Sequence, residues 1–154
     1  MNKNALPENT ANLSAQLESF LIENGAAFFR RTVKQRELFD VVTDTDKKGL
    51  TEQRITAYVH DNLIFFEASF PVAYADSDAV AAIVNDLNIR YPVGSFQFDA
   101  RDGQLTWTQF LAARNGSWPG NDSISAVFNA AREMTGLLYQ KLLALDDESA
   151  RSEM

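Results

Sequence analysis

The sequence predicts an α+β fold: an antiparallel sheet with packed helices, in the order α-βββ-α-ββ-α. Two observations lead to this prediction. Stretches of strand-like alternation come in groups that short turns join, which favours antiparallel neighbours. Stretches with a 3.6-residue apolar period stand before, between and after those groups, and they do not alternate one by one with strands. Strands and helices that are grouped in this way are typical of α+β domains.

The composition is that of one ordinary globular domain. The chain has 154 residues, of which 45% are hydrophobic, and this is enough to form a core of its own. Its formal net charge is −7, which disfavours nucleic acid as a partner because phosphate backbones are also negative. The absence of Cys excludes disulfides, thiol catalysis and metal sites with Cys ligands.

The sequence gives no sign of a membrane or a secretory signal. No apolar run approaches the roughly 18 residues of a membrane span, and the first residues lack the apolar segment of a signal peptide. We therefore expect a cytoplasmic protein without membrane contact. We also expect a flexible tail over residues 1–11, a single α+β domain over 12–145 and a flexible acidic tail over 146–154.

The first half of the domain predicts one helix and three strands. The helix has its apolar face at Leu13, Leu17, Phe20 and Leu21 and ends at Asn24-Gly25. Residues 26–36 fit a helix extension, an irregular anchor or the start of a strand, and we expect a short connection with Phe28 or Phe29 buried. The strands cover 37–43, 51–59 and 63–70 and should form an antiparallel meander. The third is almost continuously apolar, which is typical of a strand that is covered on both faces.

The second half predicts a helix, a hairpin and a long helix. The apolar positions Val80, Ile83, Val84 and Leu87 indicate a helix that Tyr91-Pro92 ends. Gly94 then opens a hairpin with arms at 95–99 and 104–110, and Asp102-Gly103 is a strong turn signal. The last helix starts near Asp122 or Ser123 and runs to about Leu145.

Few residues suggest chemistry. The single histidine, His60, lies in a predicted turn, and a general base would need a nucleophile and an orienting carboxylate beside it. Residues 44–49 resemble the start of a calcium loop, but Lys48 and Ile55 occupy ligand positions. Glu67 lies in the apolar third strand, where it points outward or pairs with an Arg across the sheet, for which Arg54 is the candidate. We therefore expect no catalytic residue, no cofactor and no metal.

Two features could contact partners. The basic run Arg30-Arg31 with Lys34 and Arg36 is either a solvated edge or a contact for an acidic partner or lipid headgroups. Most aromatic residues of the hairpin should belong to the core, but Trp118 lies in a Gly- and Pro-rich loop, and an exposed Trp is a typical interface anchor. The candidate interface residues are Phe96, Phe98, Trp107 and Trp118.

The helix-to-hairpin junction resembles that of a known family. The stretch Asn88-Ile-Arg-Tyr-Pro-Val-Gly-Ser-Phe-Gln-Phe-Asp, followed by Asp102-Gly-Gln-Leu-Thr-Trp, is similar to the YbjN-like bacterial family. The shared pattern is an Asn at the end of a helix, a Gly that opens the next strand and an Asp-Gly turn. The element order also resembles the class I type III secretion chaperones. The resemblance implies an α+β protein that forms homodimers and acts through protein contacts, without a catalytic centre.

Three functional hypotheses follow. The first is a non-enzymatic protein-interaction module of regulatory or chaperone-like type that forms a homodimer through an apolar surface of the second helix or the last hairpin, and whose protein partner is unknown. The second is a small-molecule-binding protein or an enzyme with a pocket between the sheet and the last helix, lined by Glu67, His60 and aromatic residues. The third is a nucleic-acid-associated regulator, which would need a continuous basic face.

Overall fold

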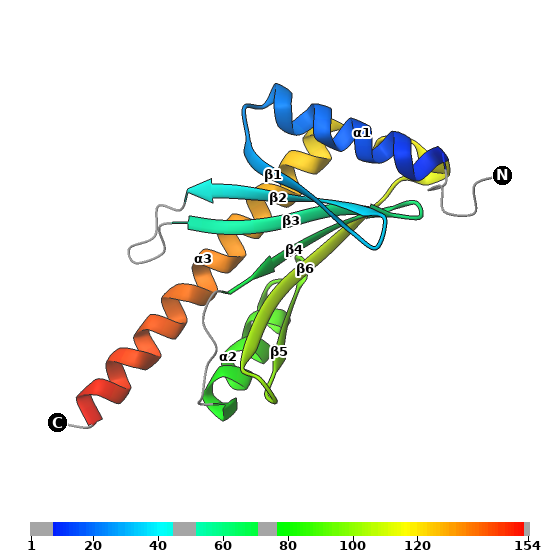
Figure 1. Ribbon diagram of the computed structural model, residues 1–154. Coiled ribbons are helices and arrows are strands. Elements are labelled where there is room, and N and C mark those ends of the chain that lie inside the picture. The colour runs from blue at the N-terminus through cyan, green and yellow to red at the C-terminus, as the bar shows by residue number, and fades with distance from the viewer. Residues whose placement is uncertain (1–7, 45–51, 71–76, 153–154) are drawn as a thin grey trace.

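The structure is a computed structural model that describes residues 8–44, 52–70 and 77–152. The described residues form three α-helices and a six-stranded sheet, whose arrangement can be followed in Figure 1. No described helix has both the length and the apolar character needed to cross a membrane. In chain order the elements are α1 (Glu8–Glu23), β1 (Ala27–Val33), β2 (Arg36–Asp44), β3 (Glu52–His60), β4 (Leu63–Ser69), α2 (Ser77–Arg90), β5 (Ser95–Asp99), β6 (Gln104–Ala112), a short 3₁₀ turn (Arg114–Gly116) and α3 (Asn121–Ser152).

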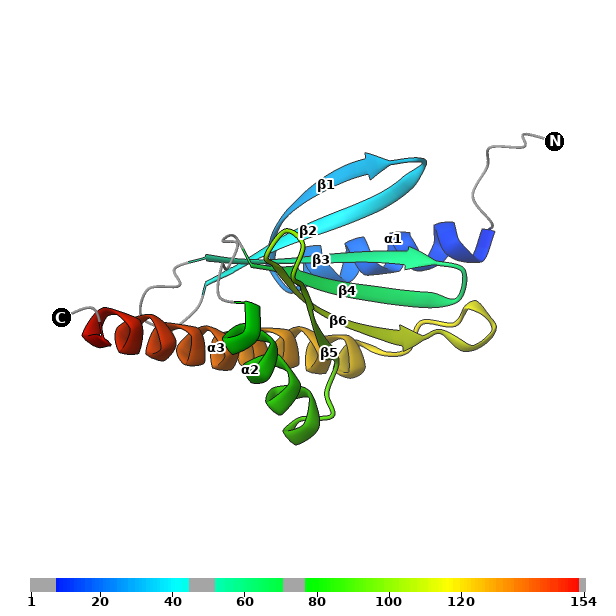
Figure 2. The same ribbon diagram turned by 90° about the horizontal axis from the view of Figure 1, so that it is seen from below.

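The sheet confirms the predicted α+β class. Its strands lie in the order β1-β2-β3-β4-β6-β5, and every neighbouring pair is antiparallel. In Figure 1, α3 passes behind the strands, and Figure 2 shows α2 and α3 together on one side of the sheet. The molecule therefore has two layers, with helices on one face of the sheet.

Strand β1 is absent from the predicted order. Residues 27–33 pair with β2, and Lys34 and Gln35 form a two-residue turn in which both have positive φ, 50° and 67°. The sequence of such a turn is usually Asn-Gly or Asp-Gly. Lys-Gln carries no such signal, so a strand was only one of three alternatives for residues 26–36 and a short connection was preferred.

The helix ends differ from the predicted ones by several residues. Helix α1 begins at Glu8, before the expected start at Asn12, and α3 continues to Ser152, beyond Leu145. The end of α1 is as predicted, because Gly25 has a φ of +65° and the N–H of Ala26 donates to the carbonyl of Leu21 at 3.0 Å. This is the Schellman arrangement of a helix that ends in glycine.

The core lies between the helices and the inner face of the sheet. The inner side chains of the central strands are fully buried, and they meet the predicted apolar faces of all three helices. Across this layer the rings of Phe66 and Phe128 make an edge-to-face contact with centroids 5.2 Å apart. The largest fully buried side chains are Trp107, Phe39, Phe66, Leu13, Leu17, Leu21, Ile55, Ile64, Leu87, Leu105, Ile124 and Leu138.

A close contact joins the α2–β5 junction to the centre of the sheet. Gly94 has a φ of +66°, and a Cβ atom added to it would lie 2.5 Å from Trp107 Cε2 and 2.7 Å from Nε1. Trp107 is fully buried, and its Nε1 donates a hydrogen bond to the carbonyl of Val93 at 3.3 Å. Only glycine satisfies both the backbone angle and the space beneath the indole.

The outer edge of β5 is closed by a side chain. Asn88, near the end of α2, accepts a hydrogen bond from the N–H of Phe96 at 2.9 Å and donates one to the carbonyl of Phe96 at 3.0 Å. Its amide thus pairs with β5 as a neighbouring strand would. This protects the edge against pairing with another chain.

Replacing Gly94 with Ala should cost far more stability than replacing Gly25. Both glycines have left-handed backbone angles, which cost an L-residue roughly 1–2 kcal/mol. Only Gly94 lies under Trp107, since nothing lies within 4 Å of a Cβ at Gly25, and the overlap should add about 1–3 kcal/mol. Urea unfolding of Gly94→Ala and Gly25→Ala measures the difference. Equal losses would mean that Trp107 moves away at no cost.

Replacing Asn88 with Ala should lower the free energy of unfolding by about 1–3 kcal/mol, because two partly buried backbone groups lose their partner. Asn85→Ala is the matched control, since Asn85 is an exposed residue of the same helix. Any gain in helix propensity is common to both variants. Thermal and urea unfolding of both variants would reveal the cost, and an Asn88→Ala variant as stable as the control would show that water replaces the amide.

Candidate functional site

The face of the sheet opposite the helices carries an unusual set of side chains. The strand registers place Leu38, Tyr58, Phe65 and Phe110 side by side across β2, β3, β4 and β6. We call these four residues the aromatic row. The rings of Tyr58 and Phe65 stack with centroids 5.2 Å apart, and Phe110 lies 6.0 Å from Phe65 and is 59% exposed. No described helix covers this row (Figure 2).

The two neighbouring rows of this face differ in charge. On one side lie Val33, Arg36, His60 and Leu63, which we call the cationic row. Arg36 Nη2 lies 2.8 Å from His60 Nδ1, and the guanidinium lies over the ring of Tyr58 at 5.2 Å. On the other side lie Phe29, Asp40, Thr56 and Glu67, which we call the carboxylate row. The open face is therefore apolar in the middle of β2, β3, β4 and β6, with Arg31 of β1 in line with this row, and it is oppositely charged on its two sides.

Asp40 is the most buried charge of this face. It is 7% exposed, and its carboxylate accepts hydrogen bonds from Arg31 Nε and from the hydroxyl of Thr56, each at 2.6 Å. Burial alone would raise the pKa of Asp40, but these two donors and the charge of Arg31 together hold its pKa below the ordinary value. The network ties the edge strand β1 to β2 and β3.

Glu67 points outward from β4, which was one of the two predicted positions. The hydroxyl of Tyr58 donates to Glu67 Oε1 at 3.4 Å. Burial, and then the negative charge of Glu67, raise the pKa of Tyr58. Arg54, the expected partner of Glu67, lies instead over the ring of Phe29 at 5.8 Å. Glu67 therefore belongs to the carboxylate row and not to a catalytic pocket.

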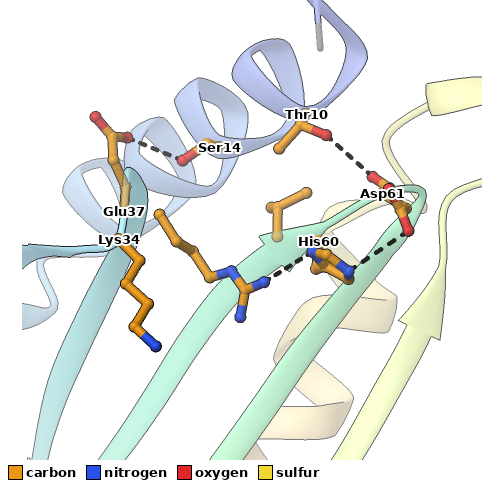
Figure 3. Close-up of a pocket in the computed structure, with 8 residues that line it drawn as sticks. Thr10, Ser14, Lys34, Glu37, His60 and Asp61 are labelled. Atoms are coloured by element: carbon orange, nitrogen blue, oxygen red, sulfur yellow. Dashed lines mark hydrogen bonds and ion pairs between the residues drawn. The ribbon is translucent and has the colours of Figure 1, made fainter. Parts of the chain in front are cut away.

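His60 lies at a small polar hollow (Figure 3). The hollow has a volume of about 200 Å³. The hydroxyl of Ser14 donates to Glu37 Oε2 at 3.0 Å, and His60 Nε2 lies 3.5 Å from Asp61 Oδ2. Most of its polar groups thus already have partners within the chain. The hollow is lined by Thr10 and Ser14 of α1, by Lys34, Arg36 and Glu37 of the β1–β2 hairpin, and by Val59, His60 and Asp61 at the end of β3.

The four predicted interface residues contact the chain's own core. Phe96 and Trp107 are 3% and 0% exposed, and Phe98 is partly buried against them. Trp118 packs on Phe20 with centroids 6.2 Å apart, and its Nε1 donates to Asn121 Oδ1 at 2.8 Å. These side chains leave little surface for a partner, because the outward face of the same hairpin carries other residues.

Sequence reasoning missed Leu38, Tyr58 and Phe65 as surface residues, and it grouped Phe110 with the hairpin aromatics, most of which were expected in the core. Phe110 is on the face of β6 opposite Trp107, so the period of two that buries Trp107 exposes Phe110. The available signal was the apolar run of β4, which predicted cover on both faces and names Phe65 as an outward residue.

A second apolar patch lies at the end of α2. Ile89, Tyr91 and Val93 are 73%, 41% and 40% exposed. The last two line a groove of about 400 Å³ whose other wall includes Met134 and Leu137 of α3. This patch is the second-helix surface at which we expected a dimer contact.

The described residues contain no group of three or more His, Asp or Glu side chains that could hold a metal ion. Residues 45–49 of the calcium-like loop lie outside the described residues. The acids of the β5–β6 turn have a local role, because Asp99 accepts hydrogen bonds from the guanidinium and the backbone of Arg101. These bonds lower the pKa of Asp99 to about 2. Asp102 accepts the N–H of Gln104. These are the turn contacts that such acids usually make.

Stability should fall in acid partly through Asp40. Because the folded pKa is lowered, the carboxylate stabilises the fold above its unfolded pKa of about 3.9. That contribution is lost as the pH falls through the folded pKa. Asp40→Asn should cost about 1–2 kcal/mol at pH 7, since Arg31 is half exposed and solvent screens the pair, and should flatten the acid limb of the stability profile. Asp86→Asn, in an exposed pair with Arg90, is the control. Parallel acid limbs for Asp40→Asn and the native chain would contradict the role of Asp40.

No protein-family model matches the chain, and no curated protein matches it. Among solved structures, the crystal structure of YbjN from E. coli, a candidate transcription regulator, matches 94% of this chain and 96% of its own chain. The TM-score is 0.63 and the sequence identity is 17%. The chain therefore has a YbjN-like α+β fold.

Proposed function

We propose that this chain is a non-enzymatic protein-interaction module of regulatory or chaperone-like type, and that it acts as a cytoplasmic homodimer. The observation that carries the proposal is the aromatic row on the open face of the sheet. In a two-layer domain the free face of an antiparallel sheet is usually polar. Here four apolar side chains form a continuous row across four strands, which is the composition of a surface that a partner covers.

The arrangement of the rings favours a protein partner over a nucleic acid. The rings of Tyr58 and Phe65 stack on each other with their planes 12° apart. One face of each ring is therefore covered by the other ring, and a base cannot insert between them. The carboxylates of Asp40 and Glu67 lie beside the row. The net charge of −7 would also repel a phosphate backbone.

The small-molecule alternative has less support. Side chains fill the space between the sheet and α3, where that pocket was expected, since Leu138 is fully buried and Phe128 packs on Phe66. The polar hollow at His60 is the specific observation that keeps a ligand-binding role as the second candidate. Its volume of about 200 Å³ is below the roughly 300–1,000 Å³ of typical ligand pockets.

The likeness to YbjN supports a regulatory role by analogy. YbjN is a candidate transcription regulator, and a regulator that lacks a catalytic centre works through contacts with other macromolecules. The analogy concerns the fold, because one fold can carry several functions. The row of apolar side chains is therefore the stronger argument.

The full chain should have twice the monomer mass of 17.2 kDa at micromolar concentration. An ordinary dimer interface of about 1,200–2,000 Å² would hold two copies together under these conditions. Multi-angle light scattering and sedimentation velocity would measure the mass over a dilution series. A monomer mass up to about 100 μM would overturn the homodimer.

A further inference from the structure

We propose that a second copy of this chain covers the open face of the sheet. The two sheets would pack face to face about a two-fold axis that runs along the aromatic row, across the strands. This inference rests on the proposed function, because it assigns the surface through which the proposed homodimer forms. Two antiparallel sheets that pack in this way lie about 10 Å apart, with strands crossing at about 30°.

The composition of β4 requires a second cover. Ile64 and Phe66 point to the helices and are fully buried, while Leu63 and Phe65 point to the open face and remain half-buried. A central strand with solvent on one side normally alternates apolar with polar residues. The four consecutive apolar residues Leu63–Phe66 are instead typical of a strand that is covered on both faces. The described helices supply only one of these layers.

A two-fold axis along the aromatic row makes the face self-complementary. The rotation places each residue of the row against its own counterpart, so Phe65 meets Phe65 and Phe110 meets Phe110 of the second copy. It also places the cationic row of one copy over the carboxylate row of the other. Self-complementarity of one patch is what a two-fold interface requires.

The pairs that this rotation creates agree in character. On β2, Arg36 comes over Asp40 of the second copy, which sets a cation against a carboxylate. On β1, Val33 comes over Phe29 of the second copy, and these two side chains are 44% and 62% exposed in the single chain. Each pair occurs twice, because the interface is symmetric. Burial of such apolar area contributes about 25 cal/mol per Å².

Two pairs are less favourable. Arg31 of β1 is opposite Leu38 on the axis, so it comes over Arg31 of the second copy, although Asp40 pairs with each guanidinium. Leu63 comes over Glu67 of the second copy, but the hydroxyl of Tyr58 already contacts that carboxylate. A two-fold axis parallel to the strands would instead lay the cationic row over the cationic row. It would place no Arg over a carboxylate. Charge complementarity therefore selects the axis across the strands.

The edges of the sheet also direct a second copy to the face. On the β5 edge, Asn88 already occupies the backbone N–H and carbonyl of Phe96. The β1 edge carries Arg30, which is held by Glu18 and Glu37 on the helix side. A pairing of β1 with itself, centred on Arg30, would bring the two Arg30 side chains together. Charged edge strands of this kind resist extension of a sheet.

Single-cysteine variants test whether two copies meet at the aromatic row, because the native chain has no Cys. Phe110→Cys lies on the proposed axis, so a short bismaleimide should join two copies into a covalent dimer. Sheets about 10 Å apart are too distant for a disulfide, whose Cβ atoms lie about 4 Å apart. Ile89→Cys is the matched control, since Ile89 is 73% exposed on the α2 patch and Phe110 is 59% exposed. Phe65→Cys is a second variant on the axis, and circular dichroism checks that each variant folds.

The outcomes separate this inference from the proposed function. Cross-linking through Phe110 or Phe65 without cross-linking through Ile89 supports the two-fold axis. Cross-linking through Ile89, or through none of the three in a chain of dimer mass, overturns the axis and leaves the homodimer standing. A native chain of monomer mass removes the homodimer itself.

Dissociation constants give an independent measure. Phe110→Glu should weaken the dimer about 30-fold, which corresponds to about 2 kcal/mol, because two carboxylates would meet at the axis. Ile89→Glu should leave the constant unchanged. Sedimentation over a dilution series measures both, and the reverse ranking would place the interface on the α2 patch.

Discussion

Trp107 packs directly over the backbone of Gly94, and the arrangement of the second half of the chain depends on this contact. The indole lies between β4 and β5 on the inner face, paired with Ala68 on one side and Phe96 on the other. It therefore fixes how close the α2–β5 junction can approach the sheet. Asn88 then sets the register of β5 through the backbone of Phe96. The indole of Trp107 and the absence of a side chain at Gly94 together position α2.

This junction was predictable because its signals are local. Pro92 stops a helix, Gly94 permits a positive φ, and Asp102-Gly103 makes a turn, so the sequence near each residue is sufficient. The apolar period likewise predicted the buried faces of all three helices. Strand β1 was not predictable in this way, because Lys34 and Gln35 adopt left-handed angles without the usual turn residues and the strand is held by tertiary contacts such as Arg31 with Asp40.

The candidate site was harder to predict for a related reason. Alternation in a strand tells which residues share a face but not which face the helices cover. Phe96 and Trp107 were named as candidate interface residues, and the structure buries both, while Phe110 is exposed. Trp118 lies in a loop whose composition is typical of exposed loops, yet its ring packs against Phe20 from a distant segment of the chain. Contacts between segments far apart in the chain decide these positions, and a single sequence does not contain them.

The apolar outer side of β4 has a consequence for how the protein responds to its own abundance. A copy that stands alone leaves Phe65 and Phe110 in contact with water, and two copies that pair as proposed would not. Association that buries these side chains stabilises the folded chain by mass action, so its resistance to unfolding and proteolysis rises with concentration. A sheet with one bare face would then make the amount of protein in the cell a determinant of how long each copy survives.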